Sequence, residues 1–287
     1  MTDAEESFSP KTILITGATS GIGRAAAEAL HAQGHCLLLV GRNPERTQAF
    51  ADTLSSRGAT AHPLIADLSV QAEIRRLAET VLEDFNALDV LINNAGAVFQ
   101  TRDVTVDDYE RTWALNHLAY FLLTHLLLDR LKEGAPARVI NVASDAHLGG
   151  SIHWDDLQLE EEWGWMGWSA YSQSKLANIL FTDELARQLE GTGVTANSLH
   201  PGFVASRFAR NNGRFASALM TLTRPIQRSI HRGAETVIWL ASAREAEGIT
   251  GEYFHDKKPH NRSSEAGDES AGRKLWAISQ AQVHLEN

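Results

Sequence analysis

Apolar, β-prone runs alternate with helical patterns from one end of the chain to the other. Strands are predicted at Thr12–Ile15, Cys36–Val40, Ala61–Ala66, Val90–Asn93, Arg138–Val142, Val194–Leu199 and Glu252–Phe254. Helices are predicted at Gly23–Gln33, Glu45–Arg57, Val70–Phe85, Val106–Lys132, Ala170–Glu190, Gly233–Ala243 and Ala271–Val283. The strand runs are continuously apolar, which is typical of strands buried on both faces. The repeated βα units therefore predict an α/β fold, with a doubly wound parallel sheet of about seven strands and helices on both faces.

A single domain is expected over residues 1–287, because no linker divides the chain. Two segments interrupt the alternation, near 148–168 and 206–232. The first holds four of the seven tryptophans, and we interpret both segments as insertions that form substrate loops. Two interpretations of the aromatic segment remain open: it lines an apolar pocket, or it packs against the sheet edge or a second subunit.

Composition narrows the classes of function. The formal net charge of −10 argues against a surface for nucleic acid or anionic membranes. The single Cys36 excludes an internal disulfide and a cysteine-based zinc site, and no spacing of histidines or carboxylates predicts a metal site. The most apolar stretch, Leu118–Leu131, is too short to cross ~30 Å of hydrocarbon. We therefore expect a cytoplasmic protein without a membrane span.

A glycine-rich turn joins the first predicted strand to the first predicted helix. Its glycines would let the backbone turn tightly and approach a pyrophosphate, which the N–H groups of the helix N-terminus would bind. A purely structural turn is the alternative. The candidate cofactor-binding residues of the turn are Gly17, Thr19, Ser20, Gly21, Ile22 and Gly23.

The end of the second strand bears on the choice of dinucleotide. An acidic residue there would bind the ribose hydroxyls and repel a 2′-phosphate, but the chain has Gly41-Arg42 instead. The guanidinium of Arg42 is suited to phosphate, and Arg46 lies one helical turn further on. NADP(H) is therefore favoured over NAD(H). An ordinary surface arginine is the alternative interpretation of Arg42.

Further cofactor candidates follow the third and fourth strands. Asp67, followed by Leu68, either accepts a hydrogen bond from the adenine amino group or caps the next helix. Asn93, Ala95 and Gly96 end the fourth strand, at the edge where open α/β sheets bind ligands. Asparagines also end strands for turn reasons alone.

Tyr171 and Lys175 stand four residues apart and so share one face of a predicted helix. At an effective dielectric constant near 20, a charge about 4 Å from the phenol contributes about 4 kcal/mol, and a pKa unit corresponds to about 1.4 kcal/mol. The pKa of Tyr171 is therefore expected to fall by up to roughly three units, towards a value useful for proton transfer. A surface pair without function is the alternative.

Three more polar features are expected near this pair. Ser144 ends the fifth strand, where its hydroxyl could hold a substrate carbonyl oxygen beside Tyr171. Asn116 lies inside a predicted helix, where asparagine is a poor helix former, so a polar role is expected. Pro201-Gly202 follows the sixth strand and forms a rigid turn at the same edge.

Taken in order, these motifs resemble those of the classical short-chain dehydrogenase/reductase family. The resemblance covers nearly the whole chain and implies a Rossmann-like single domain. It implies that Tyr171 is the general acid/base, that Lys175 lowers its pKa and binds the nicotinamide ribose, and that Ser144 orients the carbonyl. Asn116 would hold a water that relays protons. Cofactor contacts are also implied at Pro201, Gly202, Val204 and Ser206.

Other segments resemble the retinol dehydrogenase branch of that family. They are Ser144–His147, Tyr171–Leu189, Thr250–Phe254 and Arg273–Trp276. The resemblance implies an NADP(H)-dependent oxidoreductase that interconverts an apolar alcohol with an aldehyde or ketone. The alternatives are a non-catalytic NADP(H) sensor, and a reductase of a carrier-bound acyl group or a steroid ketone. The two longest predicted helices resemble those that build family dimers, which leaves a homodimer or homotetramer open.

Overall fold

The computed structural model describes residues 9–161, 163–204 and 228–285. Its strands form one eight-stranded sheet in the order β3-β2-β1-β4-β5-β6-β7-β8, parallel except for β8, which pairs antiparallel with β7. The strands are β1 (Thr12–Thr16), β2 (Cys36–Gly41), β3 (Ala61–Ile65), β4 (Val90–Asn93), β5 (Ala137–Val142), β6 (Val194–Leu199), β7 (Tyr253–His255) and β8 (Lys258–Pro259). The predicted doubly wound parallel sheet is confirmed, with β8 as an additional short edge strand.

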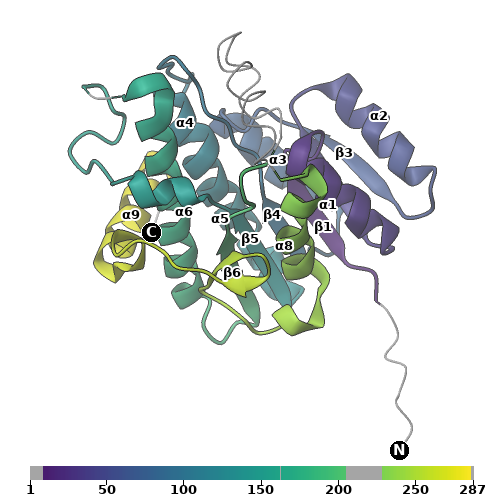
Figure 1. The fold of residues 1–287 in the computed structure, drawn as a ribbon. Coiled ribbons are helices and arrows are strands. Elements are labelled where there is room, and N and C mark those ends of the chain that lie inside the picture. Colours follow the sequence, from purple (N-terminus) through teal and green to yellow (C-terminus); the bar gives the residue numbers. More distant parts are fainter. Residues whose placement is uncertain (1–8, 162, 205–227, 286–287) are drawn as a thin grey trace, which may run out of the picture.

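Helices cover both faces of the sheet (Figure 1). The longer ones are α1 (Gly21–Ala32), α2 (Pro44–Ser55), α3 (Gln71–Asp84), α5 (Ala119–Glu133), α6 (Trp168–Gln188), α8 (Ile230–Ser242) and α9 (Glu269–Gln282). Short helical turns are α4 (Arg111–Trp113), η1 (Ala114–Leu118), η2 (Asp145–Gly149), η3 (Trp165–Gly167), η6 (Arg244–Ala246) and η7 (Glu265–Gly267). Much of the segment near 206–232 lies outside the described residues.

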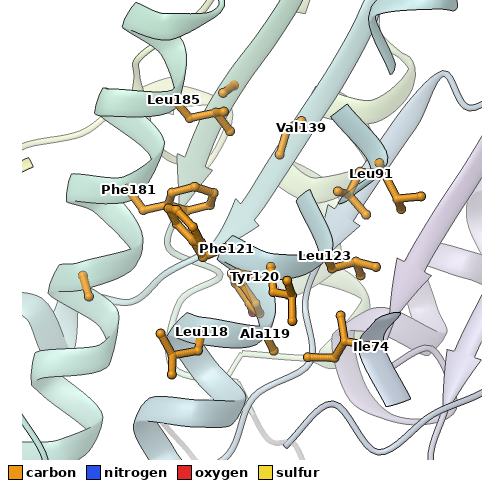
Figure 2. Packing of buried hydrophobic residues seen from close by; sticks show 14 of the residues in the cluster. Ile74, Leu91, Leu118, Ala119, Tyr120, Phe121, Leu123, Val139, Phe181 and Leu185 are labelled. Carbon is orange, nitrogen blue, oxygen red and sulfur yellow. The ribbon is translucent and has the colours of Figure 1, made fainter. Parts of the chain in front are cut away.

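Successive strand residues face two separate cores. Leu14 and Leu38 belong to the core under α3, α5 and α6, whereas Ile13 and Leu37 belong to the core under α1 and α8. All four side chains are completely buried. The continuous apolar runs in the sequence follow from this arrangement, since neither face of a central strand meets water. Figure 2 shows the first core, where Phe121 and other side chains of α5 meet residues of the sheet and of α6.

The helix predicted over Val106–Lys132 begins later, at Arg111. Thr105 and Asp108, whose spacing is typical of a capping pair, do not cap it. The backbone of Asp108 has a positive φ of 62°, and the carboxylate of Glu110 instead accepts hydrogen bonds from the first N–H groups of α4. The turn before the helix thus moves its start by about one helical turn.

Between α4 and α5 the chain makes a wider, π-helical turn, η1. Asn116 lies in this turn and is completely buried. Such turns insert one extra residue into a helix, and they are frequent at functional sites. The insertion explains how a poor helix former is accommodated within an otherwise long helix.

The C-terminal helix α9 packs on α5 and α6. The Trp276 ring lies 4.9 Å from the Phe121 ring and 5.9 Å from the Phe181 ring, measured between centroids. The helix α6 also packs on β6 and η2, and every residue of α6 from Ala170 to Ala186 is buried within the single chain. The helix α9 thus covers part of the surface of α5 and α6, the two helices whose resemblance to family dimer helices leaves a homodimer or homotetramer open.

The described part of the chain contains no helix that is both long enough and apolar enough to cross a membrane.

Candidate active site

Because strands β1 to β6 run parallel, their carboxyl ends meet at one edge of the sheet. The polar residues singled out in the sequence follow these ends. The glycine turn follows β1, Arg42 follows β2, and Ser144 follows β5. The edge therefore collects side chains from segments far apart in the sequence.

The glycine turn is tightly packed against the segment after β4. Gly17 has a positive φ of 65°. A Cβ atom on Gly23 would lie 2.4 Å from Nδ2 of Asn94 and 2.5 Å from the Gly17 oxygen, so only glycine fits there. At the start of α1 the Ser20 side chain makes no capping hydrogen bond. The first N–H groups of α1 are thus left for an anion, and the turn fits a dinucleotide pyrophosphate.

Asn94 shapes this turn, although it was absent from the predicted site residues. Its Nδ2 donates to the Thr16 oxygen at 2.8 Å, and its main-chain N–H donates to Oγ1 of Thr16. The neighbouring Asn93 behaves differently, since its side chain is buried and donates to Thr124 and Asn141. The side chain of Asn93 therefore links β4 to β5 and α5. The signal for Asn94 was its place within the strand-ending Asn-Asn-Ala-Gly motif.

Arg42 and Asp67, from neighbouring strand ends, face each other. One guanidinium nitrogen lies 3.6 Å from a carboxylate oxygen of Asp67, and the arginine side chain is 65% exposed. Burial raises the pKa of Asp67, but hydrogen bonds from Ser69 and the charge of Arg42 outweigh it and hold the pKa below its usual value. Leu68 is buried, and Arg46 is exposed on α2. Arg42 is thus accessible to a ligand and Asp67 is ionised.

Tyr171 and Lys175 lie on the first turns of α6 and are both almost completely buried. The Tyr171 side chain forms a hydrogen bond with the Ser144 side chain. Nζ of Lys175 donates to the main-chain oxygen of Val142 at 2.8 Å. The structure therefore brings the predicted tyrosine, lysine and serine together at the carboxyl end of β5.

The pKa values at this pair differ from the sequence-based expectation. Burial raises the pKa of Tyr171 to about 12, although its hydrogen bond with Ser144 lowers it. Burial also lowers the pKa of Lys175 to about 7, so its positive charge is only partly present at neutral pH. The expected lowering assumed a full charge in a partly solvated pair, and the burial of both groups removes that condition.

Asn116 lies near Lys175, and its side chain makes three hydrogen bonds. Its Nδ2 donates to the Ala97 oxygen and to Oγ of Ser174, and its Oδ1 accepts from the Ala97 N–H. A Cβ atom on Gly96 would lie 3.2 Å from Oδ1 of Asn116 and 3.5 Å from Nζ of Lys175. The strand-ending glycine therefore permits the β4 loop to pass close to both side chains.

Sequence reasoning missed Tyr120, whose ring centroid lies 5.6 Å from Nζ of Lys175. The Tyr171 ring lies at 5.8 Å from the same nitrogen, so two aromatic rings flank the ammonium group. Tyr120 is 1% exposed. The sequence does not indicate a role for Tyr120, because a tyrosine on the apolar face of a helix is typical of a core residue.

The loop after β6 carries the remaining cofactor candidates. Pro201 and Gly202 lie at the strand end, and Gly202 has a positive φ of 83°. Val204 is buried and would be within 2.5 Å of a Cβ atom on Gly233. Ser206 lies outside the described residues. Across the ranges that the structure does describe, no three histidine, cysteine or acidic side chains are grouped so that they could hold a metal ion.

The tryptophan-rich segment divides into two parts. Trp154 packs at the margin of the core, with Nζ of Lys274 lying 4.3 Å from its ring centroid. Trp165 and Trp168 are 74% and 55% exposed, and the Trp168 ring lies 5.8 Å from the Tyr171 ring. The segment thus both packs on the body of the protein and places an exposed aromatic ring next to the candidate active site.

Comparison with known proteins assigns this site to a family. The short chain dehydrogenase family matches residues 11–156 and 160–216. The chain therefore belongs to the short-chain dehydrogenase family, and it is an oxidoreductase of that type.

Within the family it is retinol dehydrogenase-like. It is 40% identical to retinol dehydrogenase 12 of Mus musculus over 94% of this chain and 85% of that protein. It is 39% identical to retinol dehydrogenase 13 of Homo sapiens over 96% of this chain and 85% of that protein.

Solved structures share the fold. An uncharacterized protein from Mycobacterium Paratuberculosis has a TM-score of 0.79 and 32% identity, over 98% of this chain and 96% of that one. A short chain dehydrogenase from Burkholderia cenocepacia J2315 in complex with NADP has a TM-score of 0.67 and 26% identity, over 85% of this chain and 94% of that one.

Proposed function

We propose that the chain is an NADP(H)-dependent oxidoreductase that interconverts an apolar alcohol with its aldehyde or ketone. The observation that carries the proposal is the meeting of Tyr171, Ser144 and Lys175 next to the β4 loop, which also packs against the glycine turn. The exposed Trp168 ring next to Tyr171 suits an apolar substrate. Relatives named retinol dehydrogenases support the same substrate class.

In the proposed mechanism the glycine turn after β1 would hold the dinucleotide, which when bound would supply the hydride chemistry at the carbon that bears the oxygen. Ser144 and Tyr171 hold the substrate oxygen between their hydroxyls. In the direction of reduction Tyr171 donates its phenolic proton to that oxygen, and in oxidation it accepts the proton. Lys175, held by the Val142 oxygen, favours the phenolate whenever it carries its charge. Asn116 keeps the β4 loop close to Lys175 through Ala97.

The first test is an assay of NADPH consumption, with NADH alongside, against a panel of apolar aldehydes and ketones. The expected result is turnover with NADPH. Tight NADPH binding without turnover of any carbonyl would contradict the proposal and favour a sensor.

Arg42→Ala is expected to raise the KM for NADPH about 10- to 100-fold and to leave the KM for NADH unchanged. The reason is the loss of a charged hydrogen bond to the 2′-phosphate, worth about 1.5–3 kcal/mol. NADH lacks that phosphate and serves as the internal control. An equal rise of both KM values would show that Arg42 does not read the phosphate.

The pKa of Tyr171 gives a second expected result. In the free protein burial raises it to about 12, so the phenol stays protonated through the neutral and mildly alkaline range. The positive charge of oxidised nicotinamide favours the phenolate and should move the titration to lower pH. Phenolate absorbance in the ultraviolet, measured as wild type minus Tyr171→Phe, should therefore appear at lower pH with NADP⁺ than without it. Identical titrations in both conditions would contradict this account.

A further inference from the structure

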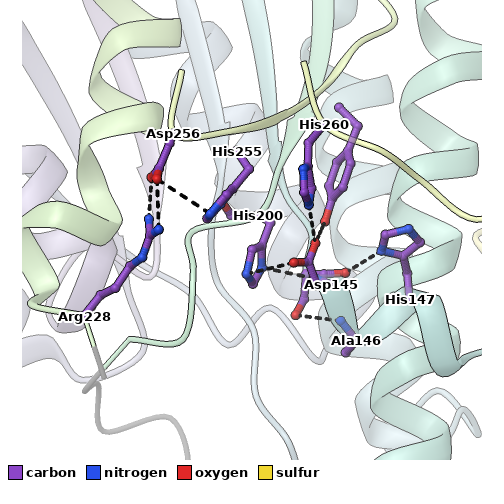
Figure 3. Close-up of polar contacts among 10 residues, drawn as sticks. Asp145, Ala146, His147, His200, Arg228, His255, Asp256 and His260 are labelled. Carbon is purple, nitrogen blue, oxygen red and sulfur yellow. Dashed lines mark hydrogen bonds and ion pairs between the residues drawn. The ribbon is translucent and has the colours of Figure 1, made fainter. Parts of the chain in front are cut away.

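A polar cluster beside Ser144 has no part in the proposed chemistry. It contains Asp145 at the start of η2, His200 after β6, Tyr253 on β7 and His260 after β8 (Figure 3). Four separate segments thus meet at one carboxylate.

Both oxygens of Asp145 are engaged. Oδ1 accepts a hydrogen bond from the Tyr253 hydroxyl at 2.8 Å and lies 3.5 Å from Nε2 of His260. Oδ2 lies 3.3 Å from Nε2 of His200. Tyr253 is 1% exposed, so its hydroxyl depends on this carboxylate for a partner.

His200 contacts Asp145 a second time. Its Nδ1 accepts a hydrogen bond from the main-chain N–H of Asp145 at 3.1 Å. The proton of the neutral ring is therefore on Nε2, which faces Oδ2 of the same residue. Burial lowers the pKa of His200 to about 4, so the ring is neutral under ordinary conditions and can keep both contacts.

The contacts between Asp145 and His200 begin where the hydrogen-bond ladder between β5 and β6 ends. The last backbone hydrogen bond between the β5 segment and the β6 segment runs from the Ala143 N–H to the Leu199 oxygen at 2.9 Å. Ser144 follows Ala143 and lies beyond this ladder. The hydrogen bond from the Asp145 N–H to His200 is the next bond between the two segments. His200 is itself anchored, since its N–H donates to the Phe254 oxygen on β7 at 2.8 Å.

We propose that Asp145 and His200 are positioning residues that hold Ser144 against the Tyr171 hydroxyl. They clamp the loop that carries Ser144 to the loop that carries Pro201 and Gly202. The clamp thereby fixes the position of the Ser144 hydroxyl relative to the candidate cofactor-binding loop. This inference rests on the proposed function, because it assigns Ser144 to the substrate oxygen.

The test is a double-mutant cycle on kcat. Asp145→Ala removes the carboxylate and is expected to lower kcat about tenfold or more, because a small misplacement of a reacting group costs that much. The same change in a Ser144→Ala background should have little further effect, because its target is already absent. Asp145→Asn keeps one acceptor oxygen and should recover part of the loss. Equal losses from Asp145→Ala in both backgrounds would overturn the proposal.

A second readout does not depend on turnover. Hydrogen exchange of peptides that span 143–150 should be faster in Asp145→Ala than in wild type, and unchanged exchange would overturn the clamp. This measurement separates failure of the clamp from failure of the proposed function, which would show as a wild type inactive on every carbonyl. If Asp145→Ala does not fold, Asp145→Asn carries both measurements with a smaller expected effect.

Asp256→Ala is the matched control. It removes another carboxylate from the neighbourhood, one that pairs with Arg228 and lies 3.8 Å from Nε2 of His255. The Asp256 side chain is 43% exposed, and Figure 3 shows its contacts with Arg228 and His255. Its removal should leave kcat within about twofold and the exchange of residues 143–150 unchanged.

Discussion

Tyr171→Phe is expected to lower kcat by about 10²–10⁴-fold, the range that a positioned general acid supplies. The phenylalanine ring fills the same buried space on α6 but has no proton to give to the substrate oxygen. The Ser144 hydroxyl and the glycine turn stay in place, so the dissociation constant for NADPH should change little. Steady-state rates and fluorescence titration with NADPH measure the two quantities separately.

Tyr109→Phe is the control for this change. Tyr109 is partly buried at the margin of the core under α3, α5 and α6, outside the candidate site. Its loss of a hydroxyl should leave kcat within about twofold. A Tyr171→Phe enzyme that kept more than about a tenth of the wild-type kcat would rule out the tyrosine as general acid.

Trp276→Ala is expected to lower the free energy of unfolding by about 3–5 kcal/mol. The indole is 9% exposed and packs against Phe121 and Phe181, so its removal leaves a cavity between α9 and the two helices that it covers. Urea denaturation followed by circular dichroism measures the change as a lower midpoint.

Arg273→Ala is the matched control on the same helix. Its side chain is 59% exposed and forms an ion pair with Glu269, one helical turn away, so the stability should change by less than about 0.5 kcal/mol. Equal losses in the two variants would mean that the α9 contact contributes through helix formation alone and not through the aromatic packing.

The fold could be predicted because its signals are local. The apolar run of each strand and the glycine turn each lie within about ten residues, and β4 and β6 have the predicted bounds. The start of the α4 segment could not be predicted, because the positive φ of Asp108 moves the cap to Glu110. Short β8 carries too few residues to give a periodic signal.

The sequence predicts that Tyr171, Lys175 and Ser144 lie close together, and the structure brings them together, but the pKa values of the pair could not be predicted. The spacing of Tyr171 and Lys175 places them on one helix face, yet it says nothing about burial, which sets both pKa values. The contact of Asp145 with His200 joins residues that are 55 positions apart. Such a contact depends on how the loops after two neighbouring strands are placed in space, and a local sequence pattern does not predict that placement.

The far end of the chain takes part in building the site. His117, next to Asn116 on the π-helical turn, bonds to Ser279 of α9 at 2.8 Å, and the Trp113 indole donates to Gln282 at 2.9 Å. During synthesis, the turn that carries Asn116 can therefore form these two hydrogen bonds only after α9 has been made. Every proposed catalytic residue is made well before that moment, so a nascent chain that ends before α9 should hold all of them and still lack an ordered active site.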